Sequence, residues 1–440
     1  MISKISGLLF FLLFSPFSSS SSPYSDLFES WCLEHGKTYT SEAEKLARFR
    51  VFEDNLAFVE NHNAAAKSTY SLALNAFADL TVHEFRAARL GLSLGLNLEL
   101  ASAGNGDRAV FQGYDAAVPD SIDWRDKGAV TQIKDQGSCG ACWAFSATGA
   151  IEGINKIATG SLVSLSEQEL IDCDRSYNSG CSGGLMDYAF NWVVKNRGID
   201  TEEDYPFHTA ESSCLKNKLS HRFVTIDGYT DVPSHNEKLL LQAVATQPVS
   251  VGICGSERAF QLYSKGIFTG PCSTSLDHAV LIVGYGSNNG VDYWILKNSW
   301  GTSWGINGYM HMLRNGGTTQ GVCGINMLAS FPTKTNPNPP SPTPGPTRCN
   351  MLTYCPSETT CCCTRRFLGL CFSWGCCELD SAVCCKDNRY CCPHDYPVCD
   401  NGTKQCFKST KNFTGVDGIE KKSSFVKFGP INPFLAQWGL

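Results

Sequence analysis

The stretch Gln136-Gly-Ser-Cys-Gly-Ala-Cys-Trp143 decides how this chain is interpreted. From Cys142 the sequence continues Cys-Trp-Ala-Phe-Ser-Ala-Thr-Gly-Ala-Ile-Glu, which favours a helix that begins at this cysteine. His278 and Asn298 follow 136 and 156 positions after Cys142. A thiol, an imidazole and an amide can serve as nucleophile, base and the group that orients the base. The pattern therefore predicts covalent catalysis at Cys142.

The thiol of Cys142 must be activated, because a neutral thiol is a poor nucleophile. The partial positive charge at the N-terminus of a helix would favour the thiolate. His278 would hold the thiol's proton as an imidazolium and later deliver it to a leaving amine, while Asn298 would bond the other ring nitrogen. Asp277 precedes His278, and we expect it to be a local electrostatic or hydrogen-bonding aid outside the triad.

Two other interpretations of these residues stay open. Cys139-Gly-Ala-Cys142 is also a Cys-x-x-Cys motif, as in a thioredoxin-like redox pair or half of a zinc site. That motif alone predicts neither Gln136 nor the contexts of the histidine and the asparagine. His278 lies in the apolar run Leu276-Asp-His-Ala-Val-Leu-Ile, so packing in a core is the alternative to catalysis.

Composition narrows the class of protein. The chain has 440 residues, enough for two to four domains of about 150 residues. Only 18% of the residues are charged and the net charge is −6, so no strong basic field argues for nucleic acid or an anionic membrane as a partner. We expect residues 1–22 to be a signal peptide, because Lys4 precedes an apolar stretch from Ile5 to Phe17 and a serine run. No other stretch is apolar and long enough to span a membrane.

The 23 cysteines divide the chain. Cys32 stands alone, eight lie from Cys139 to Cys323, and fourteen crowd between Cys349 and Cys406. In a secreted chain such numbers imply disulfides. Between the last two groups, Thr333 to Thr347 holds six prolines in fifteen residues, which is typical of an extended spacer, with a proline-recognition ligand as the alternative.

Secondary structure can be placed coarsely. The residues from about Ser25 to Ala88 are charged and helical in pattern, with the clearest helix from Ser41 to about His62. Its apolar residues, spaced by three or four, are Leu46, Phe49, Phe52, Leu56 and Val59. Strands are expected at Pro248–Ile253, His278–Tyr285 and Tyr293–Lys297, which are rich in Val, Ile, Leu and aromatic residues.

The stretch around Cys142, with the distant His and Asn, resembles the signature of papain-like cysteine proteases, the Asn being slightly late. Val118-Pro-Asp-Ser-Ile-Asp-Trp124 resembles the start of such an enzyme after processing. Residues in two motifs upstream are similar to those of the family's prosegment, with Val59 in place of Ile and Ala73 in place of Gly. These residues are Glu44, Arg48, Phe52, Asn55, Val59 and Asn63, then Asn75, Phe77 and Asp79.

The resemblance implies an α+β fold of papain type, with a helical left lobe and a β-barrel-like right lobe. A helical prosegment would precede it and a disulfide-rich module would follow. The boundaries we expect are 1–22 for the signal peptide, 23–116 for the inhibitory prosegment, 117–333 for the protease, 334–348 for the linker, 349–406 for the module and 407–440 for a tail. The polar stretch Asn97 to Gly113 suits a cleavable junction.

The resemblance also assigns site residues. Gln136 and the backbone N–H of Cys142 would stabilise the oxyanion, and Trp300 would shield the pair formed by His278 and Asn298. The implied disulfides are Cys139–Cys181, Cys173–Cys214 and Cys272–Cys323, which leaves Cys254 over, either as a small buried residue or as a reactive or intermolecular thiol.

Positions that bind substrate in the family are apolar or small here, so we expect a bulky hydrophobic residue at P2 and little acceptance of arginine. The alternative is that these side chains are only core. They are Gly183, Gly184, Leu185, Met186, Gly252, Leu276, Ala279 and Leu328.

The cysteines from Cys349 to Cys406 resemble a granulin, a ladder of hairpins held by disulfides, and zinc ligation is the rival. Fourteen cysteines rather than twelve, and Tyr390 where many granulins have His, depart from the animal pattern. The fusion resembles a group of plant proteases of the xylem bark cysteine peptidase type. Asn401 and Asn412 begin glycosylation sequons.

We therefore expect a cysteine endopeptidase made as a zymogen, without metal or organic cofactor, in the vacuole, a lysosome-like compartment or outside the cell. Its partners would be protein and peptide substrates, its own prosegment and cystatin-like inhibitors, and it would be a monomer. The alternatives are a binding or signalling protein that uses the granulin, and a thiol-disulfide oxidoreductase. A ligase that uses the same acyl-enzyme is a variant of the endopeptidase hypothesis.

Overall fold

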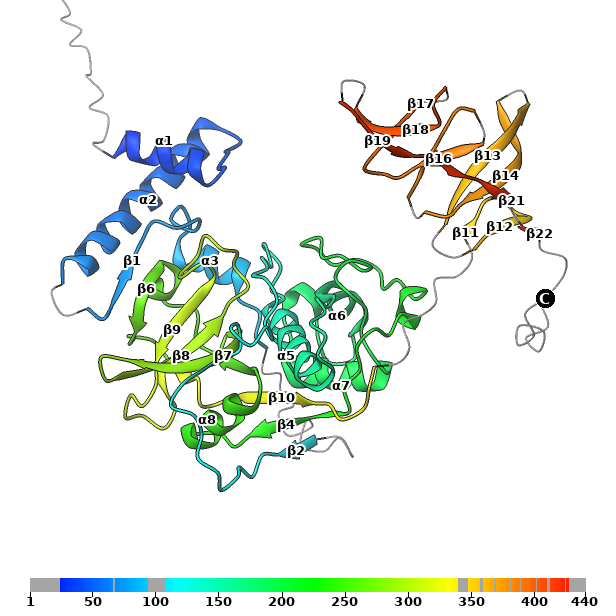
Figure 1. Ribbon diagram of the computed structural model, residues 1–440. Coiled ribbons are helices and arrows are strands. Elements are labelled where there is room, and N and C mark those ends of the chain that lie inside the picture. Colours follow the sequence, from blue (N-terminus) through cyan, green and yellow to red (C-terminus); the bar gives the residue numbers. More distant parts are fainter. Residues whose placement is uncertain are drawn as a thin grey trace, which may run out of the picture. The chain divides into compact units, whose positions relative to one another are not determined.

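The computed structural model describes residues 24–65, 68–93, 108–338, 347–356, 359–367, 369–379, 381–387, 389–400, 402–409, 412–423 and 425–426 (Figure 1). The expected signal peptide and the end of the expected tail lie outside them. The chain divides into two units, Met1–Ser341 and Pro342–Leu440. Among the described residues, no helix has the length and apolar character needed to cross a membrane.

The N-terminal segment, residues 24–93, contains α1 (Ser25–Glu34), α2 (Glu42–Asn63), β1 (Tyr70–Leu72) and α3 (Val82–Arg89). The helix predicted from Ser41 is confirmed, because the Ser41 side chain caps α2 by accepting a hydrogen bond from the N–H of Glu44. Phe52, Leu56 and Val59 are buried. Leu46 is instead 51% exposed, so its membership of the apolar series was misleading.

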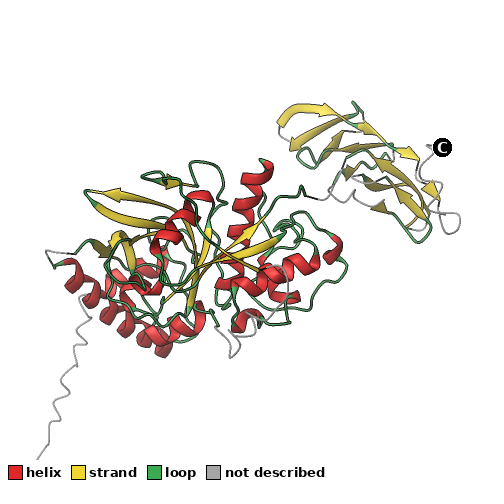
Figure 2. Ribbon diagram, turned by 90° about the horizontal axis from the view of Figure 1, so that it is seen from below, coloured by secondary structure: helices red, strands yellow, loops and turns green. Residues whose placement is uncertain are grey.

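A helical layer follows, made of α5 (Cys142–Thr159), α6 (Glu167–Cys173) and α7 (Met186–Asn196). Short 3-10 helices lie at Gly180–Ser182, Lys218–Ser220 and Val322–Gly324. Both faces of the first half of α5 are buried, because this helix packs between β7 on one side and α6 and α7 on the other. Figure 1 labels these helices beside the strands, and Figure 2 shows helices and strands in a view turned by 90°. The expected helical lobe is confirmed.

Strands form the other layer, in the order β1-β6-β9-β8-β7-β5-β10-β4-β2, with β3 paired to β7. The strands predicted around Val249, His278 and Tyr293 are confirmed as β5, β7 and β8. The edge strand β1 comes from the N-terminal segment and pairs antiparallel with β6. The bounds are β2 Arg108–Val110, β3 Ile122–Asp123, β4 Gly228–Val232, β5 Val249–Ile253, β6 Tyr263–Phe268, β7 His278–Asn288, β8 Val291–Lys297, β9 Tyr309–Leu313 and β10 Ala329–Thr333, with the helices α8 Glu237–Thr246 and α9 Arg258–Gln261 beside them.

Three disulfides join residues of this unit, Cys139–Cys181, Cys173–Cys214 and Cys272–Cys323. Cys32, Cys142 and Cys254 are free and buried. Beyond β10, Thr335 and Asn336 bond the carboxylate of Asp227, so the chain stays attached to this unit past Thr333.

The second unit is a ladder of short hairpins. Four sheets have the orders β11-β12-β22, β13-β14-β21, β15-β16-β20 and β17-β18-β19. The strand bounds are β11 Thr347–Arg348, β12 Thr353–Cys355, β13 Thr360–Phe367, β14 Leu370–Cys377, β15 Val383–Cys384, β16 Tyr390–Cys392, β17 Val398–Asp400, β18 Gln405–Ser409, β19 Asn412–Asp417, β20 Ile419–Glu420, β21 Lys422–Ser423 and β22 Phe425–Val426. Residues 412–426, expected to be part of a featureless tail, thus add the third strand to every hairpin.

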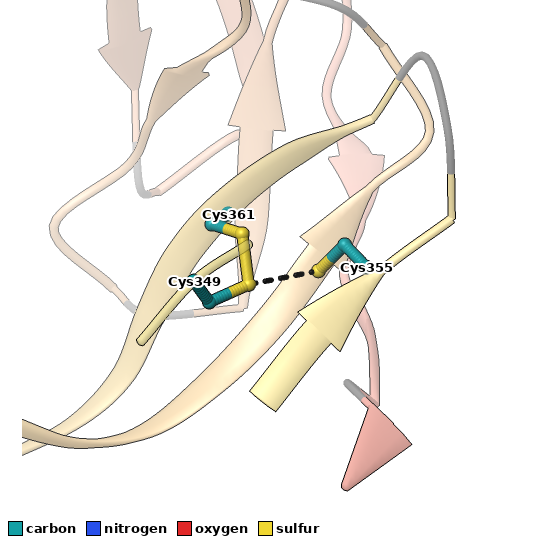
Figure 3. A group of neighbouring side chains, drawn as sticks. All are labelled: Cys349, Cys355 and Cys361. Atoms are coloured by element: carbon teal, nitrogen blue, oxygen red, sulfur yellow. Dashed lines mark hydrogen bonds between the residues drawn. A yellow bond between two sulfur atoms is a disulfide. The ribbon is translucent and has the colours of Figure 1, made fainter. Parts of the chain in front are cut away.

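Seven disulfides use all fourteen cysteines of this unit and bear out the disulfide interpretation. Figure 3 shows Cys349 bonded to Cys361, with Cys355 beside them. The sulfur of Cys349 lies 3.3 Å from that of Cys355, whose own partner is Cys376. Because these sulfurs are oxidised, no thiolates are available for zinc here. Asn401 lies outside the described residues, and Asn412 begins β19.

Candidate active site

Cys142 is the first residue of α5, as the sequence predicted. Its side chain is fully buried and free, while Cys139 is bonded to Cys181. The backbone N–H of Ala279, in β7, donates to the Cys142 sulfur over 3.4 Å. The thiol therefore lies at the positive end of a helix and against the strand that His278 begins. The pair Cys139 and Cys142 is not a disulfide here, which disfavours the redox interpretation.

His278 and Asn298 are brought together from β7 and from the loop after β8. His278 Nε2 lies 2.9 Å from Asn298 Oδ1, which also accepts the backbone N–H of Ser299. Because this oxygen accepts two hydrogen bonds, Nε2 carries the proton and donates it. The ring nitrogen Nδ1 is buried and makes no hydrogen bond with any described residue. It is left with a lone pair that can take a proton.

Trp300 covers this histidine. The two rings are stacked, with centroids 4.5 Å apart and planes inclined by 23°. Phe77 and Phe85 of the N-terminal segment meet the same indole edge-on. Water is therefore kept from the His278 ring on the side that Trp300 occupies, and the N-terminal segment closes the outer face of the indole.

Gln136 is held beside Asn298. Its Oε1 accepts the hydroxyl of Ser299 at 2.7 Å, and its backbone N–H donates to the Ser299 carbonyl. Its Nε2 donates to the carbonyl oxygens of Cys139 and of Arg89, the latter at 3.1 Å. The amide expected to bind an oxyanion is thus occupied by a carbonyl of the N-terminal segment.

Burial sets the charge state of the pair. It raises the pKa of Cys142 to about 12, although the backbone N–H groups of Ala279, Gly91 and Trp143 favour the thiolate. It lowers the pKa of His278 to about 4, although the bond to Asn298 favours the imidazolium. With the N-terminal segment in place, the Cys142 thiol and the His278 imidazole are therefore both neutral at neutral pH.

Residues Arg89–Ser93, the cleft strand, lie across the site. Gly184 N–H donates to Gly91 O at 2.9 Å, and Ser93 N–H donates to Gly184 O at 3.0 Å. Leu92 N–H donates to the carbonyl of Asp277. A Cβ on Gly91 would lie 1.9 Å from the carbonyl oxygen of Gly140, so only glycine fits at this point.

Leu92 fills the pocket expected for P2. A Cβ built on Gly252 would lie 2.8 Å from Leu92 Cδ2, 2.9 Å from Leu328 Cδ2 and 3.4 Å from Leu276 Cδ1. The side chains of Leu92, Leu276 and Leu328 therefore all lie close to Gly252 and form an apolar environment there. Of the other expected subsite residues, Leu185, Met186 and Ala279 are buried in the same apolar cluster. Gly183 has φ 118°, and a Cβ there would lie 2.9 Å from Gly91 O, so the two glycines admit a peptide backbone.

A second contact region, the docking platform, consists of residues 54–65 and 68–80 and their partners in the second half of the unit. Asn75 Nδ2 donates to Gln261 O, and Gln261 Nε2 donates to the carbonyls of Phe77 and Leu80. Arg258 bonds the side chains of Asp54 and Asn55. Together with the pairing of β1 and β6, these contacts fasten the N-terminal segment away from Cys142.

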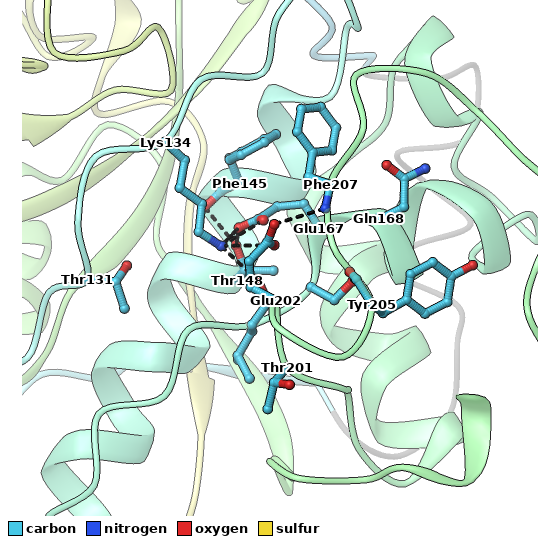
Figure 4. Close-up of polar contacts among 12 residues, drawn as sticks. Thr131, Lys134, Phe145, Thr148, Glu167, Gln168, Thr201, Glu202, Tyr205 and Phe207 are labelled. Carbon is cyan, nitrogen blue, oxygen red and sulfur yellow. Dashed lines mark hydrogen bonds and ion pairs between the residues drawn. The ribbon is translucent and has the colours of Figure 1, made fainter. Parts of the chain in front are cut away.

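Behind the site, Lys134 lies in a buried polar cluster (Figure 4). Its ammonium contacts both carboxylate oxygens of Glu167 at 2.8 Å and Glu202 at 3.4 Å. Burial acts to lower the pKa of Lys134, but the carboxylates of Glu167, Glu152 and Glu202 outweigh it and raise the pKa. Because Lys134 stands two residues before Gln136, the cluster fixes the segment that carries the expected oxyanion donor.

Sequence reasoning missed the cleft strand, Lys134 and Glu167. No motif marks the cleft strand. A glycine between two leucines directly after a helix, as at Gly91, could have indicated an extended segment that fits closely against a neighbour. Asp277, expected to be a local aid, accepts the backbone N–H of Gly255 at 2.7 Å. This hydrogen bond therefore fixes the backbone at Gly255.

Comparisons with known proteins agree with this geometry. Residues 118–333 match the model of the papain family of cysteine proteases. Residues 28–85 match the cathepsin propeptide inhibitor domain, and residues 354–407 match granulin. The chain is 50% identical over 431 residues to the probable cysteine protease RD21B of Arabidopsis thaliana, covering 96% of this chain and 90% of that protein.

The chain belongs to the papain family of cysteine proteases. It is an enzyme made as a proform, and its N-terminal segment is the prosegment. Oryzain beta chain of Oryza sativa subsp. japonica is 46% identical over 412 residues, covering 90% of this chain and 87% of that protein. The family matches at residues 118–333 and 354–407 bear out the expected combination of a papain-like protease and a granulin.

Solved structures of proforms share the fold. The recombinant stem bromelain precursor is 39% identical to this chain, with a TM-score of 0.64. The match covers 72% of this chain and 100% of that chain. The proform of the ragweed pollen allergen Amb a 11, a cysteine protease, is 41% identical with a TM-score of 0.65, covering 72% and 95%. A papain-family protease behind its own prosegment therefore acts on peptides and is inhibited by that prosegment until processed.

Proposed function

We propose that this protease hydrolyses peptide bonds through a Cys142, His278 and Asn298 triad. The observation that carries the proposal is the free thiol of Cys142 at the N-terminus of α5, beside a histidine whose Nε2 is fixed by Asn298 and whose Nδ1 is free to take a proton. Removal of the cleft strand would return water to the site and release both groups from the burial that now keeps them neutral.

In the first half of the reaction, the thiolate of Cys142 attacks the carbonyl carbon of the substrate. The oxyanion would be held by Gln136 Nε2, once Arg89 O leaves it, and by the backbone N–H of Cys142. The imidazolium of His278 then gives its proton to the leaving amine as the C–N bond breaks. The product is a thioester on Cys142 and a free amine.

In the second half, His278 takes a proton from water, whose oxygen attacks the thioester. The C–S bond breaks, the acid product leaves, and the thiolate and imidazolium are restored. Throughout, Asn298 would keep the ring in the orientation required, and Trp300 would cover the ring and its bond. An amine in place of water would give ligation by the same acyl-enzyme.

Leu92 supports a preference for a bulky hydrophobic residue at P2. This side chain of the prosegment already lies close to Gly252, as do Leu276 and Leu328, and none of these residues is charged. Arginine would leave its charge unpaired there, which costs free energy. Cleavage of a peptide library should therefore select Leu, Val or Phe at P2, and a strong selection of arginine would refute the pocket.

Processing is proposed to follow acidification and cleavage between about Gly113 and Val118. This would separate a prosegment of residues 23–116 from a protease of residues 117–333, followed by a linker (334–348), the granulin (349–406) and the tail. Sequencing the N-terminus of the active enzyme tests this, since a start well outside that window contradicts the boundaries.

We further propose entry into the secretory route by a signal peptide of residues 1–22, with the vacuole or the extracellular space as destination. The disulfides of both units suit that oxidising route. Glycosylation at Asn401 and Asn412, a monomeric state and inhibition by cystatin-like proteins are parts of the same proposal. Mass spectrometry and gel filtration of the secreted protein test the first two.

Substitution tests the mechanism. Cys142→Ala should abolish peptide hydrolysis while leaving the proform folded. Gln136→Ala should lower kcat by about a hundredfold or more, as expected for the loss of one oxyanion donor. Persistence of full activity in Cys142→Ala would overturn the assignment. It would favour the alternative in which the chain is a binding protein that uses the granulin.

A further inference from the structure

Asp200, Asp204 and His221 form a cluster of charged side chains in the connection between α7 and β4, and they share no residue with the active site. One potential ligand atom from each residue lies within 4.8 Å of the other two. Asp200 and Asp204 come from one turn, and His221 follows the short helix Lys218–Ser220. Two oxygens and one imidazole nitrogen therefore converge on one point.

The carboxylate of Asp200 is buried without its full set of partners. Its side chain is 0% exposed. Oδ1 accepts the backbone N–H of Thr201 at 2.7 Å, but Oδ2 accepts no N–H or O–H from any described residue. Oδ2 lies 3.6 Å from His221 Nδ1, so it is aimed into the cluster, and the carboxyl of Asp200 is close enough to that of Asp204 to share a hydrogen with it. A buried carboxylate oxygen beside a second carboxylate is costly unless a proton or a cation lies between them.

The other two ligands can reach both this oxygen and solvent. His221 Nδ1 lies 2.5 Å from Asp204 Oδ2. The side chains of Asp204 and His221 are 32% and 35% exposed, which leaves a path for an ion and for water. Lys218 bonds the second oxygen of Asp204, Oδ1, and does not occupy the point of convergence. It would orient this carboxylate as an outer-shell partner.

We propose that Asp200 Oδ2, Asp204 Oδ2 and His221 Nδ1 bind a divalent ion of the zinc class. Imidazole nitrogen with carboxylate oxygens suits Zn²⁺, whereas Ca²⁺ takes six to eight oxygens. Around a tetrahedral ion with ligand distances of about 2.0–2.1 Å, ligand atoms stand roughly 3.3 Å apart. The observed separations of 2.5 Å and 3.6 Å bracket that spacing, so small side-chain movements complete the site.

Binding exchanges a proton for the ion. In its imidazolium form, His221 gives the Nδ1 proton to solvent, keeps the hydrogen on Nε2 and coordinates the ion as a neutral ring, and no electron is transferred. Water from the exposed side takes the fourth position. The ion would tie the segment that contains His221 to the turn of Asp200, whose backbone is already bonded to Ser166 and Glu169. The role is therefore structural and separate from catalysis.

The test uses the full-length proform carrying Cys142→Ala, so that the catalytic thiol cannot bind metal, after treatment with EDTA. Calorimetric titration with Zn²⁺ should give one saturable site, accompanied by proton release and a raised melting temperature. Co²⁺ should bind at the same place and give visible absorption bands of a nitrogen and oxygen site. Ca²⁺ and Mg²⁺ should give neither result.

Two substitutions and one control complete it. His221→Gln and Asp200→Asn should each weaken Zn²⁺ binding by more than about a hundredfold, beyond what an outer-shell change costs. Asp200→Asn keeps the shape of the side chain, so its melting temperature without metal should not fall. His208→Gln, an exposed histidine of the same connection, should bind Zn²⁺ normally. Absence of a saturable site, or binding that survives both cluster variants, would overturn the proposal.

Discussion

The prosegment contacts the protease in two regions that differ in chemistry. The docking platform combines strand pairing, buried aromatic rings and side-chain hydrogen bonds. The cleft strand has backbone bonds, an ion pair of Arg89 with Asp135 and the buried apolar side chain of Leu92. Binding of the prosegment and obstruction of the site therefore depend on different residues. The platform holds the prosegment on the protease, and the cleft strand covers Cys142. A single assay separates them, the rate at which a small alkylating reagent reaches Cys142 in the intact proform at neutral pH.

The largest effect is expected from the platform. Phe77 is 3% exposed and packs on Phe85 and Trp300. Phe77→Ala should cost about 3–5 kcal/mol of prosegment stability, which is a rise of roughly a hundredfold or more in the alkylation rate. Leu33→Ala, at an 86% exposed position of α1, is the control and should leave the rate unchanged. Equal rates in the two variants would mean that the platform does not hold the prosegment.

Leu92→Ala tests the cleft strand through its one buried side chain. Because the hollow around Gly252 would be left unfilled, the expected cost is about 2–3 kcal/mol, the lower end for a buried leucine. The alkylation rate should rise roughly 30- to 150-fold. Ser93→Ala, which keeps the backbone bond to Gly184, should change it little. A rate unaffected by Leu92→Ala would show that backbone contacts alone close the site.

Gly91→Val separates obstruction from attachment. A Cβ at this position overlaps the Gly140 carbonyl, so the cleft strand has to move while the platform contacts stay. Overpacking of this kind costs about 1–3 kcal/mol, or roughly a 5- to 150-fold faster alkylation. Hydrogen exchange at β1 should be unchanged. Loss of protection at β1 as well would mean that the two regions act as one.

Acid should weaken the helix that leads into the cleft strand. Burial would raise the pKa of Glu84, but hydrogen bonds from Thr81 and Arg48 outweigh it and lower the pKa below 4.5. A carboxyl with a lowered pKa stabilises the folded prosegment above pH 4.5 and loses this contribution as pH falls through the folded value. Glu84→Gln should therefore flatten the acid rise of the alkylation rate by a few-fold. An unchanged pH profile would assign the acid response to other carboxylates.

The smallest effect is expected at the rim of the platform. Asp54 pairs with Arg258 over 2.6 Å, but its side chain is 75% exposed. Exposed ion pairs contribute about 0.2–1 kcal/mol, so Asp54→Asn should speed alkylation by no more than about 5-fold, and less in high salt. A larger effect that survives high salt would place this pair among the main contacts of the platform.

Much of the fold was predictable because local patterns and tertiary packing agree. The α2 helix had a capping serine and apolar residues at helical spacing, and β5, β7 and β8 were runs of β-branched and aromatic residues. Leu46 shows the limit of periodicity, since position on a helix face does not reveal whether another element covers that face. The strand β1 and residues 412–426 could not be predicted, because such short strands exist only through pairing with distant partners.

The candidate site divides in the same way. Cys142, His278, Asn298 and Gln136 were named from a spaced motif whose chemistry requires those residue types. The contribution of Leu92 and Arg89 was invisible, because a strand that lies in a cleft needs no periodicity of its own. Lys134 and Glu167 were also missed, since a charged residue near a helix start is usually solvated and only tertiary structure buries these two together.

The most direct test is labelling of the acid-processed protein with an epoxide thiol inhibitor, followed by peptide mapping, beside Cys142→Ala and the unprocessed proform. We expect the label on Cys142 alone, loss of peptide hydrolysis with labelling, and little label in the proform at neutral pH because the cleft strand covers the thiol. No label after processing, with Cys142 found bonded to Cys139, would contradict the catalytic assignment. Equal labelling before and after processing would contradict obstruction by the cleft strand.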